Sequence, residues 1–341
     1  MIRALVADDS PTARALLAAL LAADPDIRVV AEAADGAEAV ELTRTLRPDV
    51  VTMDIEMPRL DGFRATKRIL TEAPTPIVIV SGLDVKDVAI SLEALRAGAL
   101  AILPKPGGPA ATQFEQESRH FVATVKAMAR VRIVRRAAER PAPVVPPPSA
   151  LERRAVRPEA VGIVASTGGP AALHRILSEL PATYPHPVLL VQHIAIGFAE
   201  GLAHWLDGAS KLRVKVAEPG ERLQPATVYV APDNRHLGAA RDRTVELSDA
   251  PPVGGFRPSG THLFEAMARA FGAASLGVVL TGMGRDGADG LRAVRTAGGT
   301  VLAQDEATSD VFGMPAAAIR EGLADRVLPL GAIAAELVRL A

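Results

Sequence analysis

The sequence predicts two α/β domains in tandem, each built on a mainly parallel sheet with helices on both faces. The chain has 341 residues, which suits two domains at roughly 100–200 residues each. Short apolar runs rich in β-branched residues alternate with longer amphipathic stretches on both sides of a proline-rich segment, and such alternation is typical of strand–helix–strand units. That segment, residues 141–149, has five prolines in nine residues. Because proline lacks a backbone N–H and fixes φ, we expect an extended linker there.

The first domain is expected to span residues 1–125, where the strand–helix pattern repeats five times. The expected strands are Ile2–Ala7, Ile27–Ala31, Val50–Met53, Ile77–Val80 and Leu100–Leu103. The expected helices are Thr12–Ala23, Ala37–Leu46, Phe63–Glu72, Lys86–Ala97 and a stretch around Phe121–Met128. The end of this last helix and the proline-rich linker occupy residues 126–157.

The second domain is expected to span residues 158–341 and to be a doubly wound α/β domain with a less regular pattern. Its expected strands are Val161–Ala165, Val188–Gln192, Val228–Ala231, Leu276–Thr281 and Thr300–Ala303. Its expected helices are Ala171–Leu180, Phe198–Leu206, His262–Phe271, Ala288–Ala297 and Ala316–Glu321. Two more polar runs, near Arg213–Val216 and Thr244–Leu247, are expected to form a small antiparallel extension.

The composition excludes several classes of function. Hydrophobic residues make up 49% of the chain and the formal net charge is −1, as expected for a globular protein without the basic excess of a nucleic-acid binder. The absence of cysteine excludes disulfides, thiol catalysis and cysteine-ligated metal centres. No apolar run is long enough to span a membrane, and the acidic pair Asp8 and Asp9 soon after the start is foreign to a secretory signal. We therefore expect a cytoplasmic protein without membrane insertion.

A first candidate site gathers at the carboxyl ends of the strands of the first domain, where parallel α/β sheets hold their ligands. Asp8 and Asp9 end the first strand, Asp54 ends the third, Ser81 the fourth, and Lys105 the fifth. Three converging carboxylates repel each other unless a cation lies among them, and oxygen ligands suit Mg²⁺. A lysine and a hydroxyl at the same place can bind phosphoryl oxygens. Any one of these aspartates alone could simply cap a helix.

As a set, these residues resemble the receiver domain of bacterial response regulators. The matching motifs are Asp8-Asp9, Met53-Asp54, Met57-Pro58, Asp61-Gly62, Ser81 and Lys105-Pro106. The resemblance implies a flavodoxin-like five-stranded parallel sheet and a phosphoryl group accepted by Asp54 from a histidine kinase. It implies that Mg²⁺ is bound by Asp9, Asp54 and the Glu56 carbonyl, with Asp8 acting through water, and that Ser81 and Lys105 contact the phosphoryl oxygens. Ile102 departs from the pattern, since many receivers have an aromatic residue there.

A second candidate site begins with a glycine-rich turn, Ser166-Thr167-Gly168-Gly169-Pro170, between an expected strand and an expected helix. Backbone N–H groups at a helix N-terminus can cradle a phosphate or stabilise an anion beside a nucleophilic serine. The dinucleotide fingerprint G-x-G-x-x-G is not matched, and the local sequence leaves both interpretations open.

A nucleophilic serine needs a base and an orienting acid. Among seven histidines, His193 directly follows an apolar strand, and His236 is the second choice. Asp286, after a strand and within a glycine-rich loop, is the candidate acid, although it could simply cap the following helix. Asp289 and Asp305 are less well placed.

Together these segments resemble the catalytic domain of the chemotaxis protein-glutamate methylesterases, the CheB family. The matching blocks include 165–170, 191–193, 230–232, 257–259, 281–284 with 286–287, 304–306 and 312–315. The resemblance implies Ser166 as nucleophile, His193 as base, Asp286 as orienting acid and the Met283 N–H as an oxyanion donor. Two departures lie in the wall of the expected cleft: Ile194-Ala195 stands where the family usually has Met-Pro, and Gly260-Thr261 where it usually has Val-Asp.

The implied function is a phosphorylation-activated serine hydrolase of chemosensory adaptation. It would demethylate glutamate methyl esters on the cytoplasmic helices of chemoreceptors, releasing methanol, and deamidate glutamines there. A chemotaxis histidine kinase would be the phosphodonor, Mg²⁺ would act in the receiver, and the esterase domain would need no cofactor. Regulation would be mostly steric, with the receiver covering the esterase cleft. The alternatives are a catalytically idle interaction module, a DNA-binding regulator, for which no helix-turn-helix is evident, and a nucleotide-binding enzyme, for which no Walker lysine is present.

Overall fold

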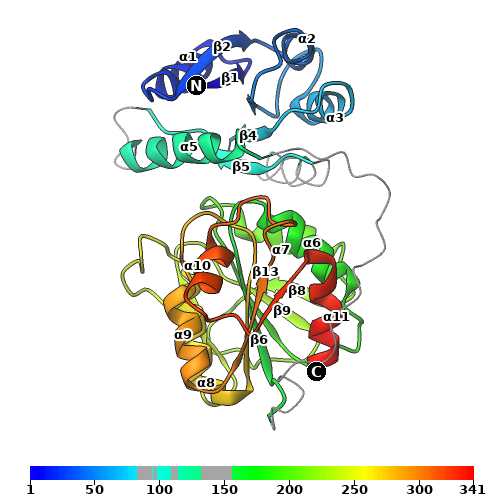
Figure 1. Cartoon of the computed structure of the whole chain (residues 1–341), viewed down its shortest axis with the longest axis vertical. Coiled ribbons are helices and arrows are strands. Elements are labelled where there is room, and N and C mark those ends of the chain that lie inside the picture. Colours follow the sequence, from blue (N-terminus) through cyan, green and yellow to red (C-terminus); the bar gives the residue numbers. More distant parts are fainter. Residues whose placement is uncertain (83–93, 95–97, 109–113, 132–155) are drawn as a thin grey trace. The chain divides into compact units, whose positions relative to one another are not determined.

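The computed structural model describes residues 1–82, 94, 98–108, 114–131 and 156–341. The chain divides into two compact units, Met1–Ala138 and Glu139–Ala341. Figure 1 shows a sheet flanked by helices in each of them. The helix predicted at Lys86–Ala97, apart from Ala94, and the proline-rich linker lie outside the described residues.

The first unit is a five-stranded parallel sheet in the order β2-β1-β3-β4-β5. Its strands are β1 Ile2–Ala7, β2 Ile27–Ala33, β3 Val50–Met53, β4 Ile77–Ser81 and β5 Ala101–Pro104. Its described helices are α1 Pro11–Ala22, α2 Gly36–Leu46, α3 Gly62–Glu72 and α5 Phe114–Met128. This strand order is that of flavodoxin-like sheets, which confirms the predicted fold of the first domain.

Side-chain caps fix where three helices of the first unit begin. Ser10 accepts the Ala13 N–H before α1, Asp35 accepts the N–H groups of Ala37 and Glu38 before α2, and Asp61 accepts the Arg64 N–H before α3. Each cap satisfies a backbone donor that has no partner inside its helix. Because the caps lie in the loops that follow β1, β2 and β3, they also fix the ends of the strands where the acidic side chains lie.

The second unit holds a seven-stranded parallel sheet in the order β14-β13-β12-β6-β7-β9-β8. Its strands are β6 Ala160–Ala165, β7 Val188–Gln192, β8 Arg213–Val216, β9 Thr227–Val230, β12 Ser275–Val279, β13 Thr300–Gln304 and β14 Arg326–Leu328. Its helices are α6 Gly169–Glu179, α7 Ala199–Asp207, α8 Gly260–Phe271, α9 Ala288–Thr296, α10 Met314–Arg320 and α11 Leu330–Leu340, with a short 3-10 turn, η2, at Gly272–Ala274.

The sheet extends from β6 in two directions: the earlier strands β7, β9 and β8 lie on one side, and the later strands β12, β13 and β14 lie on the other. The direction reverses between β6 and β12. In doubly wound sheets a crevice opens at the carboxyl ends of the strands at this reversal, and ligands bind there. The predicted doubly wound fold is confirmed, and it places the loops after β6, β7 and β12 around this crevice.

The expected antiparallel extension was partly wrong. Arg213–Val216 forms β8, which pairs parallel with β9 at the edge of the main sheet. Its polar character comes from its place at the edge, where Arg213 is exposed. The other run forms β11, Val245–Ser248, which pairs antiparallel with a strand that was not predicted, β10 at His236–Ala239.

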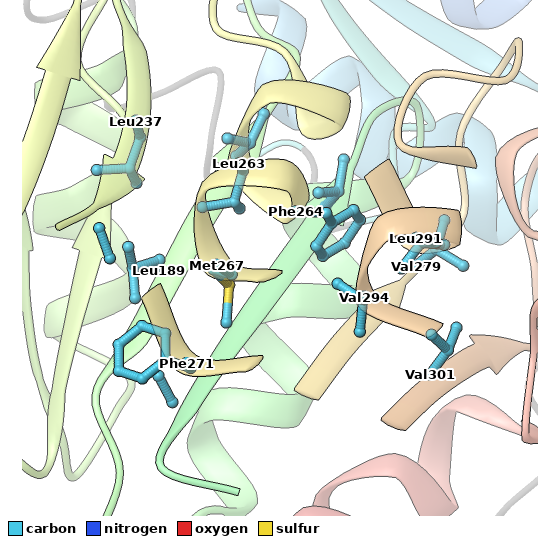
Figure 2. Packing of buried hydrophobic residues seen from close by; sticks show 14 of the residues in the cluster. Leu189, Leu237, Leu263, Phe264, Met267, Phe271, Val279, Leu291, Val294 and Val301 are labelled. Carbon is cyan, nitrogen blue, oxygen red and sulfur yellow. The ribbon is translucent and has the colours of Figure 1, made fainter. Parts of the chain in front are cut away.

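The core of the second unit lies where α8 and α9 cover the central strands. Figure 2 shows Phe264 and Met267 of α8 facing Leu291 and Val294 of α9. All four side chains are fully buried, and burying a large apolar side chain stabilises the fold by about 1.5–3 kcal/mol. This packing fixes the start of α8, which carries part of the site described next. No helix of the described residues is long and apolar enough to cross a membrane.

Candidate functional site

The first unit brings its predicted acidic residues together. Asp8, Asp9 and Asp54 each offer a carboxylate oxygen, and these oxygens lie within 4.8 Å of one another. The Lys105 ammonium lies 2.9 Å from Asp8 Oδ2 and donates to Asp54 Oδ2 at 2.7 Å. Burial, together with repulsion from Asp8, raises the pKa of Asp54 to about 6, although Lys105 opposes the rise. Asp8 and Asp54 are buried and Asp9 is exposed. Three carboxylates facing one lysine can bind a further cation, and oxygen ligands suit Mg²⁺.

Ser81 and Lys105 lie next to each other at the ends of β4 and β5, because the Lys105 N–H donates to the Ser81 carbonyl at 3.0 Å. The Ser81 hydroxyl is buried and has no hydrogen-bond partner among the residues that the structure describes. Such a buried hydroxyl costs free energy unless something binds it. It therefore fits a phosphoryl oxygen. Glu56 follows β3 with an exposed side chain, and Ile102 in β5 pairs with Ile79 of β4.

In the second unit, Ser166 follows β6 and begins the predicted glycine-rich turn. Its N–H donates to the Thr281 carbonyl at 3.0 Å, which joins it to the chain after β12. Its carbonyl accepts hydrogen bonds from the Gly169 N–H and from the side-chain amide of Gln192, both at 2.8 Å. Gly168 has φ +78°, which allows the sharp turn into α6. The turn thus presents Ser166 at the point where the sheet reverses direction.

His193 follows β7, next to Ser166 across the sheet. Its N–H donates to the Ala165 carbonyl at 3.0 Å, and its imidazole Nε2 lies 2.8 Å from Asp286 Oδ2. The side chains of His193 and Asp286 are only 9% and 4% exposed. An ionised carboxylate accepts the Nε2 proton, so Nδ1 is left as the basic nitrogen. Nδ1 is buried and has no hydrogen-bond partner in the described part of the chain.

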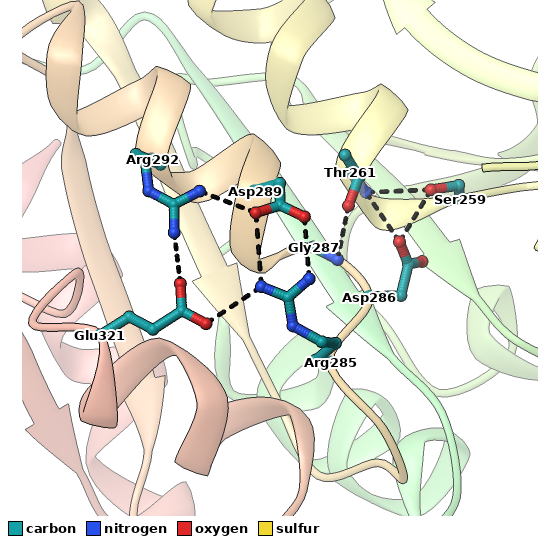
Figure 3. Close-up of polar contacts among 8 residues, drawn as sticks. All are labelled: Ser259, Thr261, Arg285, Asp286, Gly287, Asp289, Arg292 and Glu321. Carbon is teal, nitrogen blue, oxygen red and sulfur yellow. Dashed lines mark hydrogen bonds and ion pairs between the residues drawn. The ribbon is translucent and has the colours of Figure 1, made fainter. Parts of the chain in front are cut away.

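Four donors hold the Asp286 carboxylate. Oδ1 accepts the Ser259 hydroxyl at 2.8 Å and the Thr261 N–H at 3.1 Å, and Oδ2 accepts the Gly260 N–H at 2.6 Å besides His193. Burial alone would raise the pKa of Asp286, but the hydrogen bonds from His193, Gly260 and Ser259 outweigh it and hold this pKa well below its usual range. Figure 3 shows Ser259 and Thr261 facing the carboxylate. These hydrogen bonds therefore favour the ionised form of Asp286 and hold it as a partner for the imidazole.

Comparison with known proteins matches both units. Residues 161–337 match the family described as CheB methylesterase, and residues 4–113 match the response regulator receiver domain. The protein-glutamate methylesterase/protein-glutamine glutaminase 4 of Myxococcus xanthus is 56% identical over 338 residues, which cover 98% of this chain and 96% of that protein. The chain belongs to the CheB methylesterase family. The resemblance predicted from the sequence is confirmed.

Two further known proteins are similar to this chain. The protein-glutamate methylesterase/protein-glutamine glutaminase 4 of Geobacter metallireducens is 47% identical over 346 residues, covering 100% of this chain and 99% of that protein. The crystal structure of the Thermotoga maritima CheB methylesterase catalytic domain is 41% identical, with a TM-score of 0.53, and covers 55% of this chain and 100% of that chain. The fold of the second unit is thus that of a CheB catalytic domain.

The backbone N–H groups of Thr167 and Met283 are among those at the crevice that donate to no acceptor in the described residues. The loop that carries Met283 lies against Ser166, because a Cβ added to Gly282 would come within 2.7 Å of the Ser166 Cβ. Free N–H groups beside a nucleophile can stabilise an oxyanion, and the residue after the serine is a common donor. Met283 was predicted for this role. Thr167 was not, although its place directly after the serine was a usable signal.

His236, the second-choice base, is built into the fold instead. It is fully buried, its Nδ1 accepts the Ser259 N–H at 3.2 Å and its Nε2 lies 3.2 Å from the Pro251 carbonyl. Both nitrogens are engaged with the backbone, so neither is left for Ser166. Asp289, another alternative, is paired with Arg285 and with an arginine of α9 in the exposed ion-pair network of Figure 3.

The departures from the CheB pattern fall in two places. Ile194 lines a small cleft beside His193, with an empty volume of about 300 Å³, whose wall also includes Asp233 and Arg257. Burial raises the pKa of Asp233, although the N–H groups of Gly197 and Ala199 oppose the rise. Gly260 and Thr261 instead belong to the donors around Asp286, where the Thr261 hydroxyl also accepts the Gly287 N–H at 3.0 Å. These departures leave the contact between Asp286 and the imidazole intact.

Proposed function

We propose that this CheB-family protein is a phosphorylation-activated serine hydrolase that demethylates glutamate methyl esters, and deamidates glutamines, on chemoreceptors. The observation that carries the proposal is the buried pair of His193 and Asp286 beside the Ser166 turn. The names of the relatives, protein-glutamate methylesterase/protein-glutamine glutaminase, support the substrate class. The reaction restores glutamate and belongs to chemosensory adaptation.

In the proposed reaction, His193 Nδ1 takes the proton of the Ser166 hydroxyl as Oγ attacks the ester carbonyl carbon. The resulting oxyanion accepts hydrogen bonds from the N–H groups of Thr167 and Met283. The protonated imidazole then gives its proton to the leaving methoxide, which departs as methanol. Water, deprotonated by the same nitrogen, attacks the acyl-enzyme and releases glutamate and free serine. With a glutamine substrate, ammonia leaves in place of methanol.

Asp286 supports each step without changing its own protonation state. Its lowered pKa favours the ionised carboxylate at neutral pH. The carboxylate holds the proton on Nε2 and stabilises the imidazolium that forms when Nδ1 is protonated. Because four donors fix this carboxylate, it cannot turn away from the imidazole between turnovers.

For the receiver we propose that Asp54 accepts the phosphoryl group and that Asp8, Asp9, Asp54 and the Glu56 carbonyl hold Mg²⁺. When bound, Mg²⁺ supplies positive charge that neutralises the phosphoryl oxygens. Lys105 already contacts Asp54 and Asp8, and the unsatisfied Ser81 hydroxyl fits a second contact to the phosphoryl group. We infer that a chemotaxis histidine kinase is the phosphodonor, that the protein works in the cytoplasm, and that the esterase domain needs no cofactor. We place the receiver at residues 1–125 and the esterase domain at 158–341.

The test is methanol release from methylated chemoreceptor membranes, with and without Mg²⁺ and a small-molecule phosphodonor. We expect release that rises with phosphodonor in the wild type and falls by about 10⁴-fold or more in Ser166→Ala, as when other triad serines are removed. Ser178→Ala is the matched control, since within the described residues this hydroxyl bonds only the Arg175 carbonyl of its own helix, α6. Release from Ser166→Ala at the wild-type rate would overturn the assignment.

A further inference from the structure

One short segment, residues 253–261, contacts both partners of the proposed catalytic pair. Its end holds Asp286 through Ser259, Gly260 and Thr261. Its start covers the imidazole, because the ring of Phe256 is stacked on that of His193 with centroids 4.2 Å apart and planes 8° from parallel. Phe256 was not among the residues singled out from the sequence, and the reaction described above does not use it.

A tight turn fixes the place of Phe256. Val253 and Phe256 exchange two backbone hydrogen bonds of 3.0 Å each, and the residues between them, Gly254 and Gly255, have φ of +60° and +89°. Two successive positive φ angles define a type I′ turn, which glycine adopts at little cost. A Cβ on either glycine would meet open space, so backbone conformation and not crowding selects glycine here.

Arg257, the next residue, fastens the turn to the rest of the domain. Its guanidinium donates to Asn234 Oδ1 at 3.0 Å and to the carbonyls of Asp249 and Ala250 at 3.0 and 3.2 Å. Three charge-assisted hydrogen bonds to three separate residues hold the backbone on one side of Phe256, and the turn holds the other side. The backbone that carries the Phe256 ring is therefore held in place on both sides.

We propose that Phe256 is a positioning residue for the esterase reaction, whose ring sets the plane of the His193 imidazole. The proposal rests on the roles proposed above for Ser166, His193 and Asp286. The hydrogen bond from Nε2 to Asp286 fixes one edge of the imidazole but leaves the ring free to swing about that edge. Parallel stacking removes this freedom, so the plane of the imidazole, and with it the direction of Nδ1, is held constant.

The setting of Phe256 favours this role over simple filling of the core. Phe256 is half-buried and lies at a turn, whereas the aromatic side chains of the core, such as Phe264, are fully buried. An aromatic pair in an offset-stacked or edge-to-face arrangement gains about 0.5–1.5 kcal/mol beyond its burial. A residue that merely excluded water would not need a parallel ring.

The test compares Phe256→Leu, which keeps an apolar side chain without a ring, with Phe256→Tyr, which keeps the ring. Misplacing a catalytic group by about 1 Å can cost about 10²-fold in rate, so we expect kcat for methanol release from methylated receptor membranes to fall about 10–100-fold in Phe256→Leu. KM should change less than about twofold, and Phe256→Tyr should keep near wild-type kcat. Val253→Ala, in the other arm of the same turn, is the matched control and should keep wild-type kcat.

Proton NMR of protein labelled with ¹⁵N-histidine gives a readout that a purely structural role would not move. The Nε2–H signal of His193, identified by its absence in His193→Gln, should be sharp in the wild type and in Phe256→Tyr but broadened in Phe256→Leu. Denaturant unfolding followed by Trp205 fluorescence verifies that each variant is folded, and Phe256→Met replaces Phe256→Leu if the latter is unfolded. If the ring-free variants keep kcat within twofold while Ser166→Ala is inactive, the positioning role is overturned and the hydrolase assignment stands. If Ser166→Ala is active, the hydrolase assignment itself fails.

Discussion

The Ser259 hydroxyl has two roles, and its removal gives the sharpest stability prediction. It is fully buried, donates to Asp286 Oδ1 at 2.8 Å and accepts the Thr261 N–H at 3.1 Å as the N-cap of α8. Losing a hydrogen bond to a charged group costs about 1.5–3 kcal/mol, and losing a serine cap costs about 1 kcal/mol. Because one hydroxyl serves both, we expect Ser259→Ala to lower the free energy of unfolding by about 3 kcal/mol.

We expect Ser259→Ala to reduce activity less than it reduces stability. Asp286 keeps the N–H groups of Gly260 and Thr261 and the contact with His193. A tenfold fall in kcat corresponds to about 1.4 kcal/mol of transition-state stabilisation, and we expect a change of about that size in Ser259→Ala. Loss of all activity would mean that Asp286 depends on this one donor.

The assay for stability is urea unfolding followed by the fluorescence of Trp205, the single tryptophan of the chain, which lies in α7 of the second unit. The matched control is Ser248→Ala, because that hydroxyl accepts the Ala250 N–H at 3.2 Å and, within the described residues, has no hydrogen bond to a charged group. We expect the control to change stability by less than about 0.5 kcal/mol, as surface substitutions usually do. If the two variants unfold at the same urea concentration, the account of Ser259 is wrong.

Three further outcomes follow from the sites. Burial, with the adjacent His236 and Arg269, lowers the pKa of His262 from 6.5 to about 4, so its contribution to stability is complete above pH 6.5 and is lost as the pH falls toward 4. His262→Gln should therefore reduce the loss of unfolding free energy between pH 6.5 and 4 by about 1–3 kcal/mol, measured by urea unfolding at each pH, and an unchanged slope would contradict this. Asp54→Asn should abolish the rise in methanol release on adding phosphodonor, and a persistent rise would place the phosphoryl group elsewhere. Chelation of Mg²⁺ should abolish the same rise in the wild type while unstimulated release continues, and loss of both would imply a metal in the esterase reaction.

The sequence predicted most of the sheet of each domain because buried parallel strands appear as short apolar runs whatever their neighbours. It could not predict the partner of each strand. Arg213–Val216 was expected in an antiparallel extension because its polar residues resemble a solvated strand, whereas it is the parallel edge strand β8. The strand β10 was missed because its four residues begin with His236 and include a glycine, which leaves no apolar run, although the histidine is fully buried.

In the candidate site, too, the sequence indicated the main residues but not the residues that contact them. Ser166 and His193 could be chosen as candidates because each directly follows a strand of the central sheet. Asp286 could be chosen because it lies in the glycine-rich loop after β12. The residues that hold them could not, since nothing in the local sequence shows that the Gln192 amide bonds the carbonyls of both Ser166 and His193. The role of Ser259 likewise depends on the approach of two loops that lie 27 positions apart in the chain.

The Gly260 departure from the CheB pattern has a physical explanation in the neighbouring strand. A Cβ on Gly260 would lie 2.5 Å from Cγ1 and 2.9 Å from Cγ2 of Val164 in β6, closer than real Cβ atoms approach. Val164 is fully buried, and close packing in protein interiors limits how far it can move aside. The larger residue that the family usually has at position 260 therefore cannot fit against this valine. We infer that Gly260 and Val164 are a matched pair.

A double-mutant cycle tests the pairing. Overpacking costs about 1–3 kcal/mol, so Gly260→Ala should destabilise the second unit by about that amount. Val164→Ala should also be destabilising alone, because it leaves a cavity. Combined, the two changes should be less destabilising than their sum by at least about 1 kcal/mol, since the added methyl occupies the space that the valine leaves. Esterase activity should fall in Gly260→Ala and recover in the double variant. Gly260 donates its N–H to Asp286, and a displaced backbone would lengthen that hydrogen bond.

The control is Val161→Ala, a fully buried valine of the same strand, because the three heavy atoms nearest to a Cβ on Gly260 all belong to Val164. Its combination with Gly260→Ala should be additive within about 0.5 kcal/mol, as is usual for separate sites. Additive behaviour in the Val164 cycle as well would show that the backbone of α8 shifts to accept the methyl group. The departure at position 260 would then need a cause other than the valine beneath it.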